Sequence, residues 1–172
     1  VGQGDGAVIS FPDGRVWVVD TGPSPTEMLY ALRRQGVLHI DRLVLSHPHP
    51  DHFGGLEALL VNLEVEHLVV PRAPRTTGRG SGESERAYSR LLGLAKRVDF
   101  AQLPAPATLL HPQLGWTSEA RDPVNDESLV FRLTFGSRRF LFTGDIEQEA
   151  EAELLEHHAA ELQADVLKVP HH

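Results

Sequence analysis

The sequence predicts a mixed α/β fold, and the order of its apolar segments is the reason. Short strand-like runs form a hairpin near the start, and later runs alternate with segments of helical periodicity. This order is typical of mixed sheets that are covered by helices. A length of 172 residues allows one continuous hydrophobic core, so we expect a single domain over 1–172 that is a fragment of a longer chain.

The first half is expected to hold a hairpin, two helices and two further strands. Pro12-Asp13-Gly14-Arg15 is a turn sequence between the two hairpin strands. Ser24 to Glu27 has the pattern of a capping box with proline at the first helical position, and Gly36 would stop the helix that follows. The expected elements are strands at 7–11 and 16–19, a helix to about residue 35, a strand at 43–46, a helix at 55–63 and a strand at 68–70.

The second half alternates helices and strands around two turn-rich stretches. Residues 71–82 are glycine, proline and arginine without apolar periodicity, which predicts a loop. The expected elements are a helix at 83–97, short strands near 98–102 and 107–110, a hairpin of strands at 128–135 and 139–143, an acidic helix from 147 to about 160, and a last strand at 166–170.

A cluster of metal-binding side chains follows the strand at 43–46. His47, His49, Asp51 and His52 lie within six residues, separated by prolines that restrict the backbone. The first two imidazoles can face one point, and Asp51 and His52 can face a second point nearby. Structural zinc sites normally use cysteines or more widely spaced histidines, whereas such a loop can serve two adjacent ions. The pattern therefore indicates a metal site.

Two later strands end in further candidate ligands. The run at 139–143 leads to Gly144 and Asp145, a carboxylate that follows a flexible residue. Asp145 is a candidate for a ligand that bridges two ions. The last strand leads to His171 and His172, one of which would complete the second metal site.

These motifs resemble the metallo-β-lactamase superfamily, whose members carry His-x-His-x-Asp-His, a later Gly-Asp after a strand, and a final histidine. Within it, the chain is most similar to the hydrolase-like domain of the ComEC type, the DNA-uptake channel of competent bacteria, in a branch that also contains stand-alone hydrolases. The resemblance implies a four-layer αββα sandwich, here truncated at its C-terminus. The segments that carry it are 1–5, 19–22, 45–56, 125–130, 141–146 and 164–172.

The resemblance also suggests roles for the candidate ligands. Two divalent ions, manganese or zinc with magnesium as a further possibility, would activate a water for hydrolysis, and Asp51 and His52 would be catalytic. Asp20 would orient a ligating imidazole, or simply cap the turn after its strand. The expected ligands are His47 and His49 for the first ion, Asp51, His52 and His171 for the second, and Asp145 between them.

One position departs from the superfamily pattern. Most members supply a third histidine to the first ion just before the strand at 128–135, whereas this chain has Asn125. An amide oxygen is a weaker and harder ligand than imidazole, so the first site would be loose or would favour manganese or magnesium over zinc. His111 is an alternative ligand, although a lone histidine is more often an ordinary surface or core residue.

Composition limits the ligands and the compartment. The chain has no cysteine, which excludes disulfide partners and thiolate ligands and leaves histidine and carboxylate. It has no run of 18 apolar residues and no signal-like start, so we expect this segment to be soluble. The resemblance implies an extracytoplasmic domain, attached to the membrane channel portion of the same polypeptide in the inner membrane.

The overall charge is acidic, whereas one segment is basic. A formal net charge of −8 argues against a globally basic nucleic-acid binder. An arginine-rich loop and residues beside the presumed site are still suited to phosphate contacts. The candidate substrate-binding residues are Gln3, Asp5, Arg72, Arg75, Arg79 and Lys168, with Arg86 and Arg90 on the following helix.

Three functions are compatible with the sequence. The leading hypothesis is a metal-dependent phosphodiesterase that cuts single-stranded or duplex DNA during uptake of transforming DNA. The second is a stand-alone hydrolase of small phosphoesters or lactones. The third is a DNA-binding module with weak or absent catalytic activity, in which Asn125 is the sign of an incomplete metal site.

Overall fold

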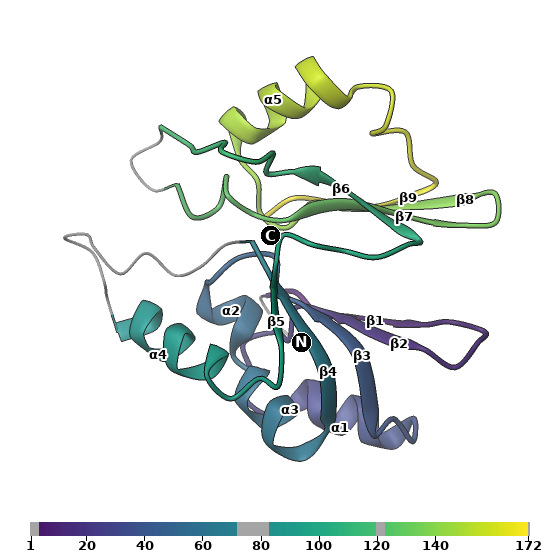
Figure 1. Ribbon diagram of the computed structural model, residues 1–172, viewed down its shortest axis with the longest axis vertical. Coiled ribbons are helices and arrows are strands. Elements are labelled where there is room, and N and C mark those ends of the chain that lie inside the picture. Colours follow the sequence, from purple (N-terminus) through teal and green to yellow (C-terminus); the bar gives the residue numbers. More distant parts are fainter. Residues whose placement is uncertain (1–3, 72–82, 120–122, 172) are drawn as a thin grey trace. The chain divides into compact units, whose positions relative to one another are not determined.

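The computed structural model describes residues 4–71, 83–119 and 123–171. The chain divides into two compact units, Val1–Phe100 and Ala101–His172, and each unit contains one sheet with its own helices (Figure 1). The predicted mixed α/β class is thereby confirmed. None of the helices in the described ranges is long and apolar enough to cross a membrane.

The first unit is built on a five-stranded sheet in the order β1-β2-β3-β4-β5. β1 and β2 form the predicted antiparallel hairpin, and β2 to β5 run parallel to one another. The helices lie on one face of this sheet (Figure 1). The elements are β1 (Ala7–Ser10), β2 (Val16–Val19), α1 (Glu27–Arg34), β3 (His39–Val44), α2 (Pro50–Phe53), α3 (Leu56–Asn62), β4 (Glu64–Val70), α4 (Glu83–Leu92) and β5 (Val98–Phe100).

The core of the first unit forms where these helices pack on the sheet. Leu32 of α1, Leu43 of β3 and Leu59 of α3 are fully buried in one apolar cluster. Because β2 and β3 are parallel neighbours, their carboxyl ends meet at the same edge of the sheet. The residues that follow β2 and those that follow β3 are therefore brought together.

The second unit contains a four-stranded sheet in the order β6-β7-β8-β9. β6, β7 and β8 are antiparallel, whereas β8 and β9 are parallel. Ala150 and Leu154 of α5 are buried against Leu110, Val130 and Leu141 of the sheet. The elements are β6 (Ala107–His111), β7 (Val130–Phe135), β8 (Arg138–Phe142), α5 (Gln148–His158) and β9 (Val166–Lys168).

Several element boundaries differ from the sequence-based predictions. β3 and β4 begin earlier than their apolar runs, because their first residues are polar and pair across the strands, with His39 Nδ1 3.5 Å from Glu64 Oε2. α4 ends at Leu92, short of the predicted end at residue 97, and the N–H of Gly93 bonds to the carbonyl of Arg90 in a tighter turn. The short helix α2 was not predicted.

The packing of α3 can be tested by truncating one of its side chains. Leu59 is fully buried, whereas Val61 on the same helix is 69% exposed. We expect Leu59→Ala to lower the free energy of unfolding by about 2–5 kcal/mol because it leaves a cavity. Val61→Ala is the matched control, with an expected change below about 0.5 kcal/mol. Urea unfolding followed by circular dichroism measures both, and equal effects would contradict this packing.

Candidate metal centre

The histidine loop, residues 47–52, begins three residues after the end of β3 and folds back on itself. His49 has an extended backbone and precedes Pro50, the first residue of α2. The carbonyl of His49 accepts a hydrogen bond from the N–H of His52 at 2.9 Å, which closes a tight turn. The ring centroid of His47 consequently lies 4.7 Å from that of His49 and 4.1 Å from that of His52. The imidazole of His47 thus contacts both other imidazoles of the loop within one unit.

Two of these imidazoles have nitrogens spaced as ligands of a single ion are spaced. His47 Nε2 and His49 Nδ1 lie 3.1 Å apart. Nitrogens bound tetrahedrally to zinc at about 2.0–2.1 Å from the metal lie roughly 3.3 Å from each other. His47 is completely buried and His49 is half-buried, so the pair is shielded from competing water. The donor set and its spacing therefore fit a divalent metal.

The third imidazole is held by a buried carboxylate at the end of β2. Asp20 Oδ2 lies 3.1 Å from His52 Nδ1 and 2.8 Å from Ser46 Oγ, while Asp20 Oδ1 accepts the N–H of Ser46 at 2.8 Å. A proton on Nδ1 satisfies this carboxylate and leaves the lone pair of His52 on Nε2, the atom that a metal would use. The N–H and hydroxyl of Thr21 both donate to the carbonyl of His52, at 2.7 and 3.0 Å.

The backbone of Asp20 makes this arrangement possible. Its φ of 54° lies in the left-handed region, which aspartate tolerates better than most residues. Its N–H donates to the carbonyl of Val44 at 2.8 Å, which continues the pairing of β2 with β3 for one further residue. The side chain then turns toward the histidine loop. The sequence is compatible with two roles for Asp20, orienting an imidazole or capping the turn after β2, and both stay predictions. Its carboxylate lies against the imidazole of His52.

Asp5 lies close to the same imidazole. Its Oδ2 is 4.0 Å from His52 Nδ1, and one ligand atom each from Asp5, Asp20 and His52 lie within 4.8 Å of one another. A Cβ on Gly4 would clash with the backbone oxygen of Asp51, so the chain before β1 packs directly on the histidine loop. The sequence suggested a substrate contact for Asp5. The structure places it where it can also help to hold a cation.

A buried tyrosine on α4 interacts electrostatically with Asp20. Tyr88 is 2% exposed, and its ring lies 5.5 Å from that of Phe53, the last residue of α2. Burial raises the pKa of the Tyr88 hydroxyl, and the nearby negative charge of Asp20 raises it further. Tyr88 is therefore neutral at physiological pH and contributes no charge to the site.

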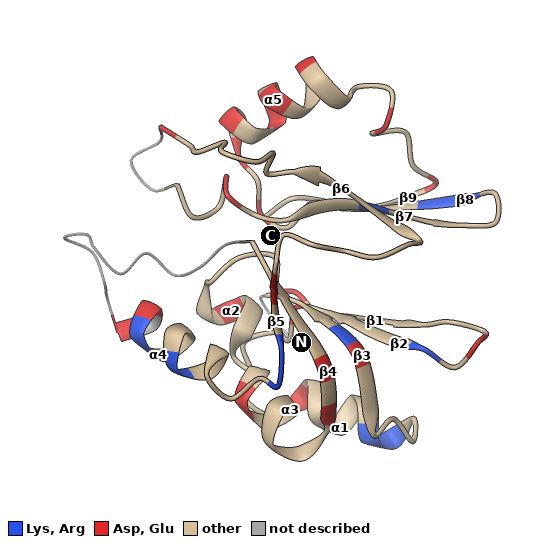
Figure 2. Ribbon diagram, viewed as in Figure 1, with Lys and Arg blue, Asp and Glu red and all other residues tan. Residues whose placement is uncertain are grey.

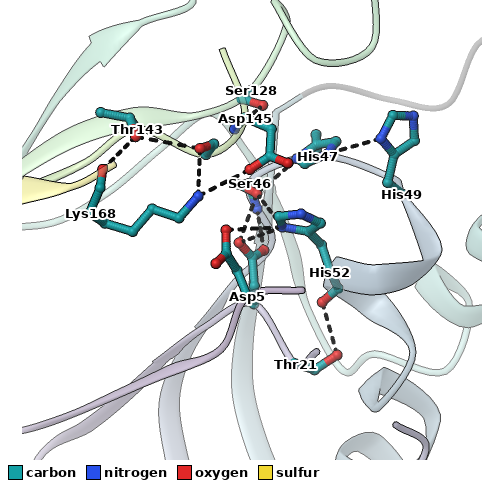
Figure 3. Close-up of polar contacts among 12 residues, drawn as sticks. Asp5, Thr21, Ser46, His47, His49, His52, Ser128, Thr143, Asp145 and Lys168 are labelled. Carbon is teal, nitrogen blue, oxygen red and sulfur yellow. Dashed lines mark hydrogen bonds and ion pairs between the residues drawn. The ribbon is translucent and has the colours of Figure 1, made fainter. Parts of the chain in front are cut away.

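The second unit presents Asp145 at the end of β8. Gly144 has a φ of 55°, which turns the chain after Thr143, and the N–H of Asp145 donates to Ser128 Oγ at 3.2 Å. The ammonium of Lys168 donates to Asp145 Oδ1 at 3.0 Å and to the carbonyl of Gly144 at 2.7 Å (Figure 3). Asp145 is 2% exposed, so this ion pair is largely shielded. The sequence suggested a substrate contact for Lys168 but not this pairing.

Comparison with known proteins identifies the family. The sequence model of the metallo-beta-lactamase superfamily matches residues 1–172. The chain belongs to this superfamily. It is 31% identical over 199 aligned residues to ComE operon protein 3 of Bacillus subtilis and 30% identical over 164 to competence protein ComA of Neisseria gonorrhoeae. These alignments cover 100% and 94% of this chain, but only 24% and 20% of those proteins.

Two further comparisons concern a solved structure of the same fold and a relative that matches about half of the chain. A candidate metallo-beta-lactamase from Thermotoga maritima superposes with a TM-score of 0.58 at 19% identity, covering 97% of this chain and 93% of that one. This likeness supports the superfamily fold. Hydroxyacylglutathione hydrolase of Stenotrophomonas maltophilia is 33% identical over 97 residues, which cover 49% of this chain and 38% of that protein.

The remaining predicted site residues are distributed over both units. Asp51 lies on α2 and is half-buried, and His171 follows β9 with an exposed side chain. His111 is buried in the second unit, with its ring nitrogens 3.1 Å from Glu153 Oε2 and 2.7 Å from the carbonyl of Asp126, so it has no nitrogen available for a metal. The predictions for Gln3, Arg72, Arg75, Arg79 and His172 concern residues outside the described ranges.

The role of Asp20 can be tested by replacing its carboxylate. In Asp20→Asn one oxygen becomes an NH2 group, which cannot accept the bonds that Ser46 and His52 provide. We expect the affinity for Zn²⁺ or Mn²⁺ to fall by about 10–100-fold, as is typical when a residue that supports a metal ligand is changed. Isothermal titration calorimetry measures this.

The matched control is Asp13→Asn, which removes a carboxylate paired with Arg15 in the turn after β1. The control should bind metal as the wild type does. Wild-type affinity in Asp20→Asn would show that Asp20 does not orient His52 for a metal.

Proposed function

We propose that the chain is a metal-dependent phosphodiesterase that cleaves DNA, as part of a larger protein that takes up transforming DNA. The observation that carries the proposal is the contact of His47 with both His49 and His52, with His52 held by Asp20. Membership of the superfamily supports hydrolysis. Two relatives that are named as competence-related proteins support DNA as the substrate.

The ligand set is proposed from donor chemistry and from the superfamily pattern. His47 and His49 would hold a first divalent ion, and Asp51, His52 and His171 a second, with Asp145 shared between them. Such ions, manganese or zinc in the first place, would supply a water of near-neutral pKa and positive charge for a phosphoryl oxygen. Asp51 and His52 would then lie next to the reacting atoms.

The residues of the chain would set the geometry for this chemistry. Asp20 fixes the tautomer of His52, and Ser46 connects Asp20 to the neighbouring His47, whose Nδ1 lies 3.0 Å from Ser46 Oγ. The hydrogen bond that the N–H of Asp145 donates to Ser128 Oγ holds Asp145 in place at the end of β8. Lys168 neutralises that carboxylate, and its ammonium would be available for a substrate phosphate once a metal ion takes its place at Asp145.

Contacts with DNA would be local, because the whole chain is acidic. The helix α4 carries basic segments (Figure 2). Arg86 and Arg90 are exposed and lie four residues apart on this helix, so they share one of its faces. Together with the arginines of the preceding loop that are predicted to bind substrate, they would contact backbone phosphates and would not discriminate between base sequences. Few such contacts imply weak binding that salt reduces further.

The partner and the location are proposed for the whole protein. Because the chain spans about a quarter of ComE operon protein 3 and a fifth of ComA, the remainder of such a protein would supply a membrane channel portion. This chain would then be its domain outside the cytoplasm, where incoming DNA first arrives.

The nuclease proposal predicts metal-dependent cleavage. The purified protein should cut labelled single-stranded or duplex oligonucleotides in Mn²⁺ or Zn²⁺, and EDTA should abolish cleavage. His49→Ala should slow cleavage by at least about 100-fold, beyond the 10–100-fold loss typical of residues that only support a ligand. His157→Ala is the control, since this exposed histidine lies on α5. No cleavage with any metal, or equal rates for His49→Ala and the wild type, would refute the proposal.

A second candidate function is the hydrolysis of a small ester, which the similarity to hydroxyacylglutathione hydrolase favours. The same preparations should therefore be assayed with bis(p-nitrophenyl) phosphate and with a lactone. Turnover of the lactone at a higher kcat/KM than DNA would favour this candidate, and the nuclease proposal predicts the reverse order.

The ion pair of Lys168 generates a separate prediction. The ammonium of Lys168 and a divalent ion would compete for the Asp145 carboxylate, so Lys168→Met should raise the affinity for Mn²⁺ by about tenfold, equivalent to about 1.4 kcal/mol. Lys96→Met is the control, because Lys96 pairs with Glu64 at an exposed position. Electron paramagnetic resonance of free Mn²⁺ measures both affinities. An unchanged or lower affinity in Lys168→Met would argue against Asp145 as a ligand.

A further inference from the structure

The side-chain amide of Asn125 has a fixed orientation, and only one of its two polar atoms has a hydrogen-bond partner among the described residues. Its Nδ2 donates to Glu147 Oε1 at 2.8 Å. A carboxylate only accepts hydrogen bonds, so the nitrogen must face Glu147 and the oxygen must face away. That oxygen is buried and accepts no hydrogen bond from any residue in the described ranges. A buried oxygen without a partner is destabilising, so a partner other than the described residues is expected there.

The segment that carries Asn125 is fixed on several sides within the second unit. Asp126 Oδ1 accepts the N–H groups of Glu147 and Ala150 at 2.9 and 3.1 Å, which joins the segment to the start of α5. The N–H of Ser128 donates to the carbonyl of Asn125 at 2.9 Å, and Ser128 Oγ accepts the N–H of Asp145. Asn125 is therefore positioned in the same hydrogen-bonded set of loops as the candidate ligand Asp145.

We propose that the Asn125 amide oxygen is a metal ligand and that Glu147 is the positioning residue that orients it. This inference rests on the proposed metal centre and adds a prediction of which metal ions the centre prefers. Asn125 stands where the superfamily pattern has a histidine, and carbonyl oxygens suit manganese and magnesium, whereas imidazole suits zinc. A metal site that uses this amide oxygen would therefore prefer Mn²⁺ or Mg²⁺ more strongly than a site with a histidine at this position.

Glu147 contributes in two ways. Its hydrogen bond stops the amide from flipping, which would present a nitrogen that cannot bind a cation. Its charge also polarises the amide, so that the opposite oxygen becomes a better donor to a cation. The backbone N–H of Glu147, held by Asp126, keeps this residue in place.

The test measures affinities for Mn²⁺ and Zn²⁺ by competition with a fluorescent chelator, without DNA. Asn125→His should raise the preference for Zn²⁺ over Mn²⁺ by at least about tenfold. Glu147→Ala should lower Mn²⁺ affinity by about 10–100-fold, whereas Glu147→Gln, whose side-chain oxygen can accept the same bond, should stay within about threefold of the wild type. An unchanged preference in Asn125→His, or equal losses in both Glu147 variants, would overturn the inference.

Asn62→His is the matched control, because both atoms of the Asn62 amide already have partners in Arg33 and Ala58. Its metal preference should equal that of the wild type. A measurement that needs no variant guards against misfolding: in the wild type, Mg²⁺ should shift the side-chain ¹³Cγ resonance of Asn125 and leave that of Asn62 unchanged. The absence of this shift would also overturn the inference.

These outcomes can be distinguished from those of the nuclease proposal. A protein with the expected metal preferences that does not cut DNA refutes the nuclease and leaves the role of Asn125 supported. A protein that cuts DNA with unaltered metal preference in Asn125→His refutes only the role of Asn125.

Discussion

The hydrogen bonds of the buried Asp20 carboxylate are the interaction on which the candidate site depends. One side chain accepts from the backbone and hydroxyl of Ser46 and from the imidazole of His52, and so it joins the ends of β2 and β3 to α2. Any of these groups left buried without a partner would cost about 1–3 kcal/mol. The unusual backbone of Asp20, the parallel pairing of β2 with β3 and the turn at His49 all serve this arrangement.

The second unit uses the same principle with different chemistry. Two of its candidate ligands, Asp145 and Asn125, each have a partner that sets their orientation or their charge. Lys168 accompanies Asp145, and Glu147 accompanies Asn125. Networks of this kind specify one arrangement of side chains, because a flipped amide or a displaced carboxylate leaves a buried group unsatisfied. Within each unit, hydrogen bonds from neighbouring side chains thus orient the candidate ligands.

The sequence predicted the histidine loop, the opening hairpin and the mixed α/β class because these depend on residues close together in the chain. The hairpin turn of β1 and β2 and the cluster around His47 are local patterns. The contact of Asp20 with His52 spans 32 residues, and that of Asn125 with Glu147 spans 22, so no local periodicity reports them. The early start of β3 was missed for a related reason, because His39 is stabilised by partners on another strand.

The most direct test of the account is anomalous diffraction at the zinc edge from crystals grown with Zn²⁺. The account predicts a peak about 2.0–2.1 Å from both His47 Nε2 and His49 Nδ1. A peak confined to Asp5 and Asp20, or none near the histidine loop at full zinc saturation, would contradict it.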